Sequence, residues 1–304
     1  MDLSGILPTL VVTLREGFEA ALVVGIVLAC LKKAGQTQLY RWVYLGVSGG
    51  IVASVLVGLF LGDMLQELQS SKALYAPVVK EILTGMFGLV AIAMLSWMLI
   101  WMTQQAKSLK SEVEGAIHTA LERNLGTGRA IFLLIFIAVL REGFETVLFI
   151  VAKFQGGFAL PTLGAIAGLL LAAGIAALLF KWGIKIDIRL FFQVMGVLLL
   201  LIIGGLVVGA LKHFDGAVAL LSQLNPNYAN WCISQGTSCL LGPLVWDASG
   251  ILPDGKFPGI LLKALFGYRQ KLYLAQAIAY ILFLSIVGGL YFQSLRGRTV
   301  AAAK

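Results

Sequence analysis

The stretch Arg15-Glu16-Gly17-Phe18-Glu19 decides how this chain must fold, and it recurs letter for letter as Arg141-Glu142-Gly143-Phe144-Glu145. Both copies stand inside runs of otherwise apolar residues, at about 6–31 and 129–152. An ionisable side chain at the depth of a bilayer costs roughly 2.5–3.5 kcal/mol on translocon scales, so three of them in each run are expensive. The same five residues, tolerated twice at this cost, indicate a functional site.

The whole chain has the composition of an integral membrane protein. Of its 304 residues, 59% are hydrophobic and only 12% are charged, whereas a soluble domain carries about a quarter charged residues. The net charge of +8 does not require a nucleic-acid partner, because Lys and Arg gather in the cytoplasmic loops of membrane proteins.

Seven runs are long enough to span a bilayer as helices, and we predict an all-α membrane protein with seven transmembrane helices. Besides the two motif-bearing runs, the expected spans are Val43–Gly62, Ile82–Met102, Phe158–Phe180, Leu190–Leu211 and Leu272–Gln293. With the N-terminus outside, thirteen Lys and Arg residues fall on the cytoplasmic side and three in the short outer loops. This distribution predicts an outside N-terminus and a cytoplasmic C-terminus.

The two motif helices would be the first and fourth spans, so they would run in opposite directions. The second and fifth spans are both rich in Gly, Ala and Ser, which allow close helix packing in lipid. We therefore predict two inverted three-helix repeats plus a seventh helix, within a single permease domain. We expect the first repeat at 1–102, a cytoplasmic connector at 103–128 and the second repeat at 129–211. An extracytoplasmic loop should follow at 212–271, and the seventh helix with its tail at 272–304.

Two of the connections have features of their own. The connector 103–128 carries apolar residues at helical spacing with charges between them, which predicts an amphipathic helix at the membrane surface. The outer loop contains Cys232 and Cys239, which we expect to form a disulfide in an oxidising compartment.

The paired motif has the chemistry of a cation site. On a helix Arg15, Glu16 and Glu19 share one broad face, and the same holds for Arg141, Glu142 and Glu145. If the two helices cross, four carboxylates meet two guanidinium groups and leave a net charge of −2. All four expected ligands are hard oxygens, which suit Mg, Ca, Mn or iron.

Three other interpretations of the motif can be stated. The charged residues could be structural ion pairs that join the helices, although each motif would retain one unpaired Glu. A di-iron carboxylate enzyme would require Glu-x-x-His pairs, which the chain lacks, so we expect no enzymatic activity. A membrane redox subunit would require intramembrane His ligands for haem or more than three Cys for clusters.

Two further acidic residues lie on the expected outer side. Glu81 begins the third span and could receive an ion on its way inward, or it could cap the helix or pair with Lys80. Asp247 stands in the outer loop and is either a second position for incoming ions or a solvated turn residue.

Two Arg-Glu-Gly-x-Glu motifs in the first and fourth of seven helices resemble the high-affinity iron permeases, the oxidase-dependent iron transporter family of fungi and bacteria. The resemblance covers essentially the whole chain, and the compact length is similar to that of the bacterial members. It implies iron import across the plasma or inner membrane, with Glu16, Glu19, Glu142 and Glu145 as iron ligands. Fungal members carry an Asp-Ala-Ser-Glu motif in the last outer loop, and here Gly250 replaces that Glu after Asp247.

The resemblance also implies an extracytoplasmic oxidase or iron-binding protein as partner, with no tightly bound cofactor. The metal itself stays open between iron and another divalent ion such as Mn or Pb. Its oxidation state is open too, because a site of −2 matches Fe²⁺ whereas the resemblance favours Fe³⁺.

Overall fold

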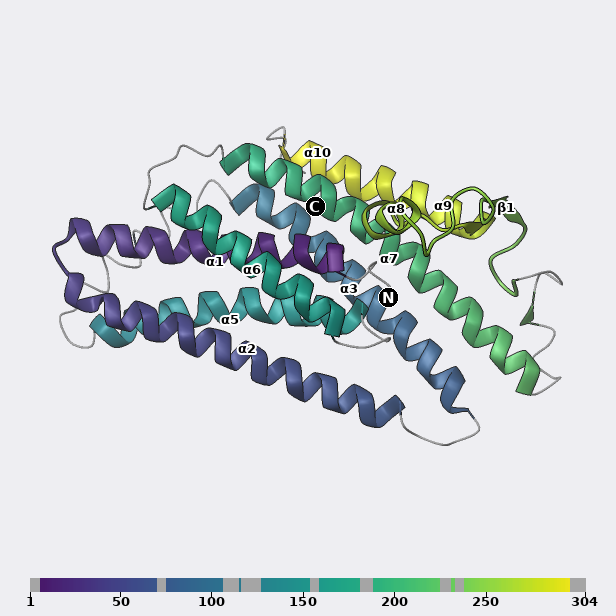
Figure 1. The fold of residues 1–304 in the computed structure, drawn as a ribbon, viewed down its shortest axis with the longest axis horizontal. Helices are drawn as coiled ribbons and strands as arrows, with labels where there is room; N and C mark the ends of the chain where they lie inside the picture. The colour runs from purple at the N-terminus through teal and green to yellow at the C-terminus, as the bar shows by residue number, and fades with distance from the viewer. Residues whose placement is uncertain are drawn as a thin grey trace, which may run out of the picture.

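The computed structural model describes residues 6–69, 75–105, 115, 127–153, 159–180, 188–224, 231–232 and 238–295. Long helices dominate these ranges (Figure 1). In chain order they are α1 (Ile6–Lys33), α2 (Tyr40–Gln69), α3 (Ala76–Gln105), α5 (Thr127–Lys153), α6 (Ala159–Phe180), α7 (Ile188–Leu224), α8 (Gly259–Phe266), α9 (Leu274–Phe283) and α10 (Gly289–Leu295). A π-helical turn, Leu284–Gly288, joins α9 to α10 without a break.

Five segments of the described chain are long and apolar enough to cross a membrane, which agrees with an all-α membrane protein. They are Thr37–Asp63, Ala76–Trp101, Pro161–Phe180, Leu190–Leu224 and Leu274–Leu295. The motif helices α1 and α5 have 28 and 27 residues, which is sufficient length, but each carries the three ionisable residues of its motif. The count of seven spans therefore stays a prediction where α1 and α5 are concerned.

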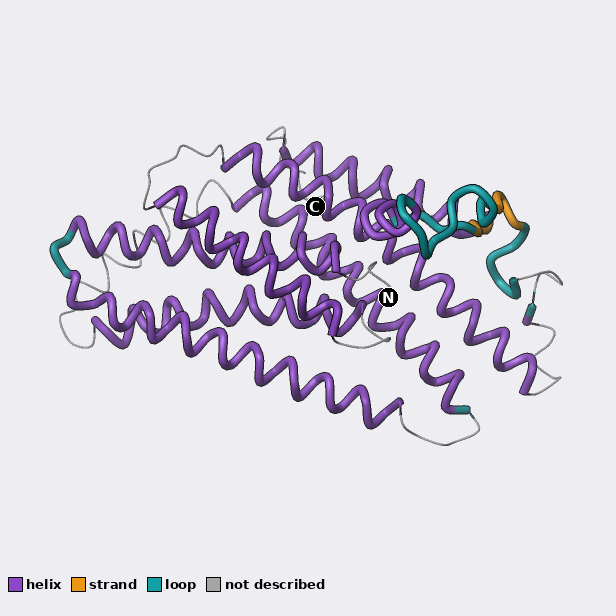
Figure 2. The backbone as a smooth tube through the Cα atoms, viewed as in Figure 1, coloured by secondary structure: helices purple, strands orange, loops and turns teal. Residues whose placement is uncertain are grey.

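The helices lie side by side as a bundle in which the chain runs back and forth (Figures 1 and 2). The most extensive packing joins α1 to α6, α2 to α5 and α3 to α7, and α1 also packs directly on α5. In Figure 1 α1 and α5 run in opposite directions, as the sequence predicted for the motif helices. Each half of the chain thus contributes one helix to every major pair.

The contacts of the two halves correspond residue by residue. A Cβ built on Gly17 of α1 would lie 3.0 Å from the Cβ of Ala172 in α6, and one built on Gly143 of α5 would lie 2.6 Å from the Cβ of Ser54 in α2. Equivalent positions differ by 126 residues between α1 and α5, as for Gly17 and Gly143, and by 118 residues between α2 and α6, as for Ser54 and Ala172. Two more pairs of contacts are related by the same two differences in residue number. These are Gly168 with Leu14 and Gly50 with Leu140, and Gly164 with Ile6 and Gly46 with Phe132.

Small residues therefore let the helix backbones of this bundle approach closely, as they generally do in lipid. The close approach seats the motif helices against α2 and α6 on one side and leaves their charged faces available to each other. Two clusters of buried apolar residues fill the remaining interior, one around Phe18, Phe149, Leu199 and Tyr291 and the other around Val27, Leu31 and Ile135.

The connection expected at 212–271 differs from the prediction. We expected the sixth span to end at Leu211, but α7 continues to Leu224, because its further turns pack on the beginning of α3. A Cβ on Gly85 of α3, for example, would lie 2.8 Å from the ring of Phe214. The same connection also contains α8 and a two-stranded antiparallel sheet of β1 (Leu244–Asp247) and β2 (Lys271–Tyr273), which the sequence analysis did not anticipate.

The expected amphipathic helix of the connector 103–128 falls mainly on residues 106–114 and 116–126, which lie outside the described residues.

Candidate metal centre

The first motif forms a closed, buried cluster around Arg15. The side chains of Arg15 and Glu16 are 3% and 2% exposed, and Arg15 Nη1 donates to Glu16 Oε1 at 2.7 Å. Arg15 Nη2 lies 3.2 Å from Glu19 Oε1, one helical turn further on. The same Nη1 also lies 3.6 Å from Met98 Sδ of α3, so α3 covers this guanidinium.

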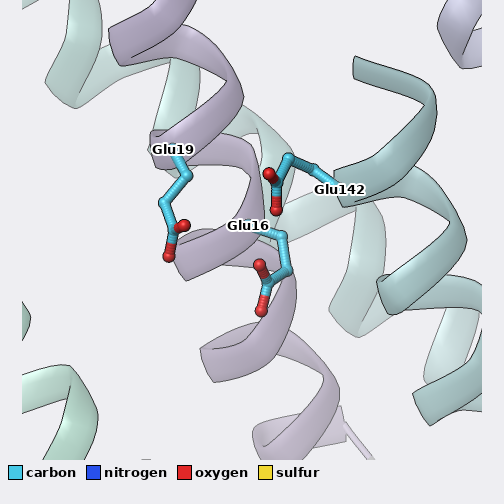
Figure 3. Close-up of side chains that lie close together, drawn as sticks. All are labelled: Glu16, Glu19 and Glu142. Atoms are coloured by element: carbon cyan, nitrogen blue, oxygen red, sulfur yellow. The ribbon is translucent and has the colours of Figure 1, made fainter. Parts of the chain in front are cut away.

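Three glutamates from two helices meet beside Arg15. Oxygen atoms of Glu16 and Glu19 on α1 and of Glu142 on α5 all lie within 4.8 Å of one another. Figure 3 shows Glu142 reaching from α5 toward the two glutamates of α1. We call these three residues the three-glutamate cluster.

Two oxygen atoms of the cluster are buried without a hydrogen bond. Glu16 Oε2 has no partner among the described residues. Glu19 Oε1 accepts no hydrogen bond either, because its 3.2 Å approach to Arg15 gives charge pairing without the alignment that a hydrogen bond needs. A buried, unsatisfied carboxylate oxygen costs free energy, and a bound cation removes that cost. The donor set is made of hard oxygens only, which suits Fe²⁺, Mn²⁺, Mg²⁺ or Ca²⁺.

The second motif is arranged differently, although its sequence is identical. Arg141 Nε donates to Glu145 Oε1 at 3.1 Å, and the side chain of Arg141 is 45% exposed. Its guanidinium lies over the ring of Trp101, 4.4 Å from the centroid. The sequence led us to expect four glutamates around one site, whereas the structure groups Glu16, Glu19 and Glu142 and pairs Glu145 with Arg141 outside that group.

Glycines position the two motifs on their helices. Gly17 lies against Ala172 and Leu169 of α6, and Gly143 lies against Ser54 of α2. Side chains at these two positions would push α1 and α5 away from their supporting helices and so displace the adjacent carboxylates. The glycine of each motif is thus explained by packing and the glutamates by the site.

The remaining candidate residues lie away from the cluster. Glu81 Oε2 lies 2.7 Å from Nδ1 of His213, which pairs α3 with the far part of α7. His213 could not be identified from the sequence, because the sixth span was expected to end at Leu211 and only a longer helix brings His213 opposite Glu81.

Asp247 lies at the end of β1, where it accepts a hydrogen bond from the Ser249 amide at 3.0 Å and lies 3.5 Å from Lys271 Nζ. These hydrogen bonds from Ser249, together with Lys271, hold the pKa of the Asp247 carboxyl below its ordinary value. Cys232 and Cys239 are joined by a disulfide. Asp215 of α7 holds the Cys239 end of this loop, because its Oδ1 accepts hydrogen bonds from the amides of Cys239 and Leu240 at 2.9 and 2.6 Å.

Comparison with known proteins connects this chain to a family of iron permeases. Residues 6–296 match the model of the iron permease FTR1 family. An uncharacterized protein of Synechocystis sp. is 52% identical over 300 residues, which cover 98% of this chain and 96% of the relative. The ferrous iron permease EfeU of Yersinia pestis is 30% identical over 295 residues, 95% of each chain, and that of Escherichia coli O6:K15:H31 is 29% identical over 277 residues, 90% of each. No solved structure matches the chain.

Proposed function

Because the family model covers nearly the whole chain, this protein belongs to the iron permease FTR1 family, and we propose that it imports iron through the three-glutamate cluster. The single observation that supports this site best is the convergence of Glu16, Glu19 and Glu142 around two buried oxygens that lack hydrogen bonds. Structural ion pairing accounts for the position of Glu19 Oε1 beside Arg15, but it leaves Glu16 Oε2 buried without a partner among the described residues.

The charge of the cluster favours a divalent ion. Three carboxylates beside the one buried guanidinium of Arg15 leave a net charge of −2, which Fe²⁺ neutralises. The relatives from Yersinia pestis and Escherichia coli carry the name ferrous iron permease, which favours the same oxidation state. We therefore propose Fe²⁺ as the ion that occupies the cluster during transport.

We further propose that the chain crosses the inner membrane seven times, with its N-terminus outside, as two inverted repeats and a seventh helix. The matched contacts of Gly17 and Gly143, and of Gly168 and Gly50, support the repeat, because equivalent helices meet equivalent partners. Burial of Arg15 and Glu16 against each other supports placing α1 within the membrane despite its charged residues. An extracytoplasmic oxidase or iron-binding protein remains a predicted partner.

The test is metal uptake into proteoliposomes that contain the purified protein. Fe²⁺, kept reduced, and Fe³⁺ are supplied separately, and Mn²⁺ or Pb²⁺ is added as a competitor. We expect Fe²⁺ uptake by the wild type and its loss in Glu16→Gln and Glu142→Gln, with each variant still inserted in the bilayer. Normal uptake by either variant would refute the shared site. Stronger uptake of Mn²⁺ or Pb²⁺ than of iron would instead assign the cargo to that ion.

A further inference from the structure

The two arginines of the repeated motif occupy opposite environments. Arg15 is buried, with its side chain 3% exposed, and is bonded to the glutamate that follows it in sequence. Arg141 is 45% exposed and bonds instead to Glu145, four residues on. Because the two motifs are identical in sequence and both helical, Arg141 has the same side-chain reach along its helix as Arg15, which would allow it to bond to Glu142.

Two contacts hold Arg141 away from Glu142. One is the 3.1 Å hydrogen bond to Glu145, and the other is the face of Trp101, 4.4 Å from the guanidinium carbon. Both Arg141 and Glu145 line a cleft of about 50 Å³ between α3 and α5, whose other walls include Met94 and Phe149. Apart from Arg141 and Glu145 this cleft is lined by apolar side chains, so the guanidinium depends on Glu145 and the Trp101 ring for its partners there.

The position of this one guanidinium decides the charge of the cluster. With Arg141 in the cleft, Glu142 is free to point toward Glu16 and Glu19, as Figure 3 shows. If Arg141 turned back to bond to Glu142, as Arg15 bonds to Glu16, the net charge would change from −2 to −1 and one ligand would be occupied.

We propose that Arg141 is a tethered competitor of the transported cation, held in the α3–α5 cleft by Trp101 and Glu145 while the cluster is open to the ion and turning to Glu142 to expel the ion from it. This inference rests on the proposed function and adds to it the residue that empties the site. Trp101 is then a positioning residue, because it acts on the cluster through Arg141.

The first test measures Fe²⁺ binding to the purified full-length protein under anaerobic conditions. Loss of a cation–π contact corresponds to about a twofold to thirtyfold change in an equilibrium, so Trp101→Leu should weaken Fe²⁺ binding within that range. Trp101→Tyr keeps an aromatic face and should bind like the wild type. Adding Arg141→Gln to Trp101→Leu should restore binding, because the competitor is gone. Unrestored binding in that double variant overturns the proposal, since it would give Trp101 a purely structural role.

The second test locates the guanidinium without any metal. In a Cys30→Ala background, Met94→Cys supplies a single free thiol in the cleft, because the other two cysteines form the disulfide. Anionic methanethiosulfonates should modify this thiol faster than cationic ones, and Trp101→Leu should lower that preference severalfold. Ala93→Cys, exposed on the same helix but outside the cleft lining, serves as the control and should show no such change.

The two tests separate failure of this proposal from failure of the proposed function. An unchanged charge preference in Trp101→Leu overturns the tethered competitor, whatever iron does. A changed preference in a protein that binds no Fe²⁺ supports the mobile Arg141 and refutes the iron site. Disulfide-linked dimers of Met94→Cys would mean that a second copy covers the cleft, which also overturns the proposal.

Discussion

Replacing Glu142 by Gln should stabilise the metal-free protein and remove most of the stabilisation that Fe²⁺ gives. Glu142 lies within 4.8 Å of Glu16 and Glu19. Two ionised carboxylates at that separation repel each other by about 3.5 kcal/mol at an effective dielectric constant of 20. The variant removes this repulsion from the empty site, so without metal we expect it to unfold at a higher temperature than the wild type.

With metal the difference between the two proteins should narrow, because Fe²⁺ stabilises the wild type far more than the variant. A site that binds Fe²⁺ gains about 2.7 kcal/mol of stability at a concentration one hundred times its Kd. Removing one member of a buried charged set costs about 3–5 kcal/mol, which weakens binding by a hundredfold or more. At the same Fe²⁺ concentration the variant should then gain about 0.4 kcal/mol or less.

Thermal unfolding of purified protein in detergent, with and without Fe²⁺ under anaerobic conditions, measures both effects. Glu81→Gln is the matched control, because it removes a carboxylate that is paired with His213 and lies outside the cluster. It should retain the whole metal-dependent shift. A full shift in Glu142→Gln, or a lost shift in Glu81→Gln, would show that the ion binds elsewhere.

Three further outcomes can be measured. Gly168→Val should destabilise the protein by about 1–3 kcal/mol, because a Cβ there would lie 2.7 Å from a carbonyl oxygen of α1, whereas Gly174→Val meets nothing within 4 Å and should unfold like the wild type. Asp215→Ala leaves two amides of the disulfide loop without their acceptor, so hydrogen exchange at those amides should accelerate at an unchanged disulfide content. The pKa of Asp247 is lowered in the fold, so the stability that its carboxylate contributes is present above the ordinary value of 3.8 and is lost as the pH falls through the lower folded pKa. Hydrogen exchange of the Ser249 amide should rise in that pH range. Asp247→Asn should remove this pH dependence.

The positions of the long helices could be predicted from the sequence, because hydrophobic runs of sufficient length have few alternatives in lipid. The end of α7 could not. Lys212, His213 and Asp215 look like the start of a polar loop, and only their contacts with α3 and the disulfide loop explain why the helix continues. Local composition carries no information about a partner more than a hundred residues away.

The sequence predicts four glutamates as ligands, but it does not show how the structure divides them. Two identical motifs predict a symmetric site with Glu142 and Glu145 equivalent to Glu16 and Glu19. The structure breaks that symmetry through Trp101 and Met98 of α3, which hold Arg141 and contact Arg15 respectively. A repeat that is symmetric in its motif can be asymmetric in its surroundings, and single-sequence reasoning detects only the former.

The exchange of partners between the two halves has a consequence for biosynthesis. The main neighbour of α1 is α6, which begins at Ala159, long after α1 ends at Lys33. A ribosome therefore delivers Arg15, Glu16 and Glu19 to the membrane well before the helix that packs beside them has been made. Until α5 and α6 have been made, Arg15, Glu16 and Glu19 lack two of the helices that pack against α1. Neither half of the chain is therefore a complete folding unit, because each major helix pair needs one member from the other half.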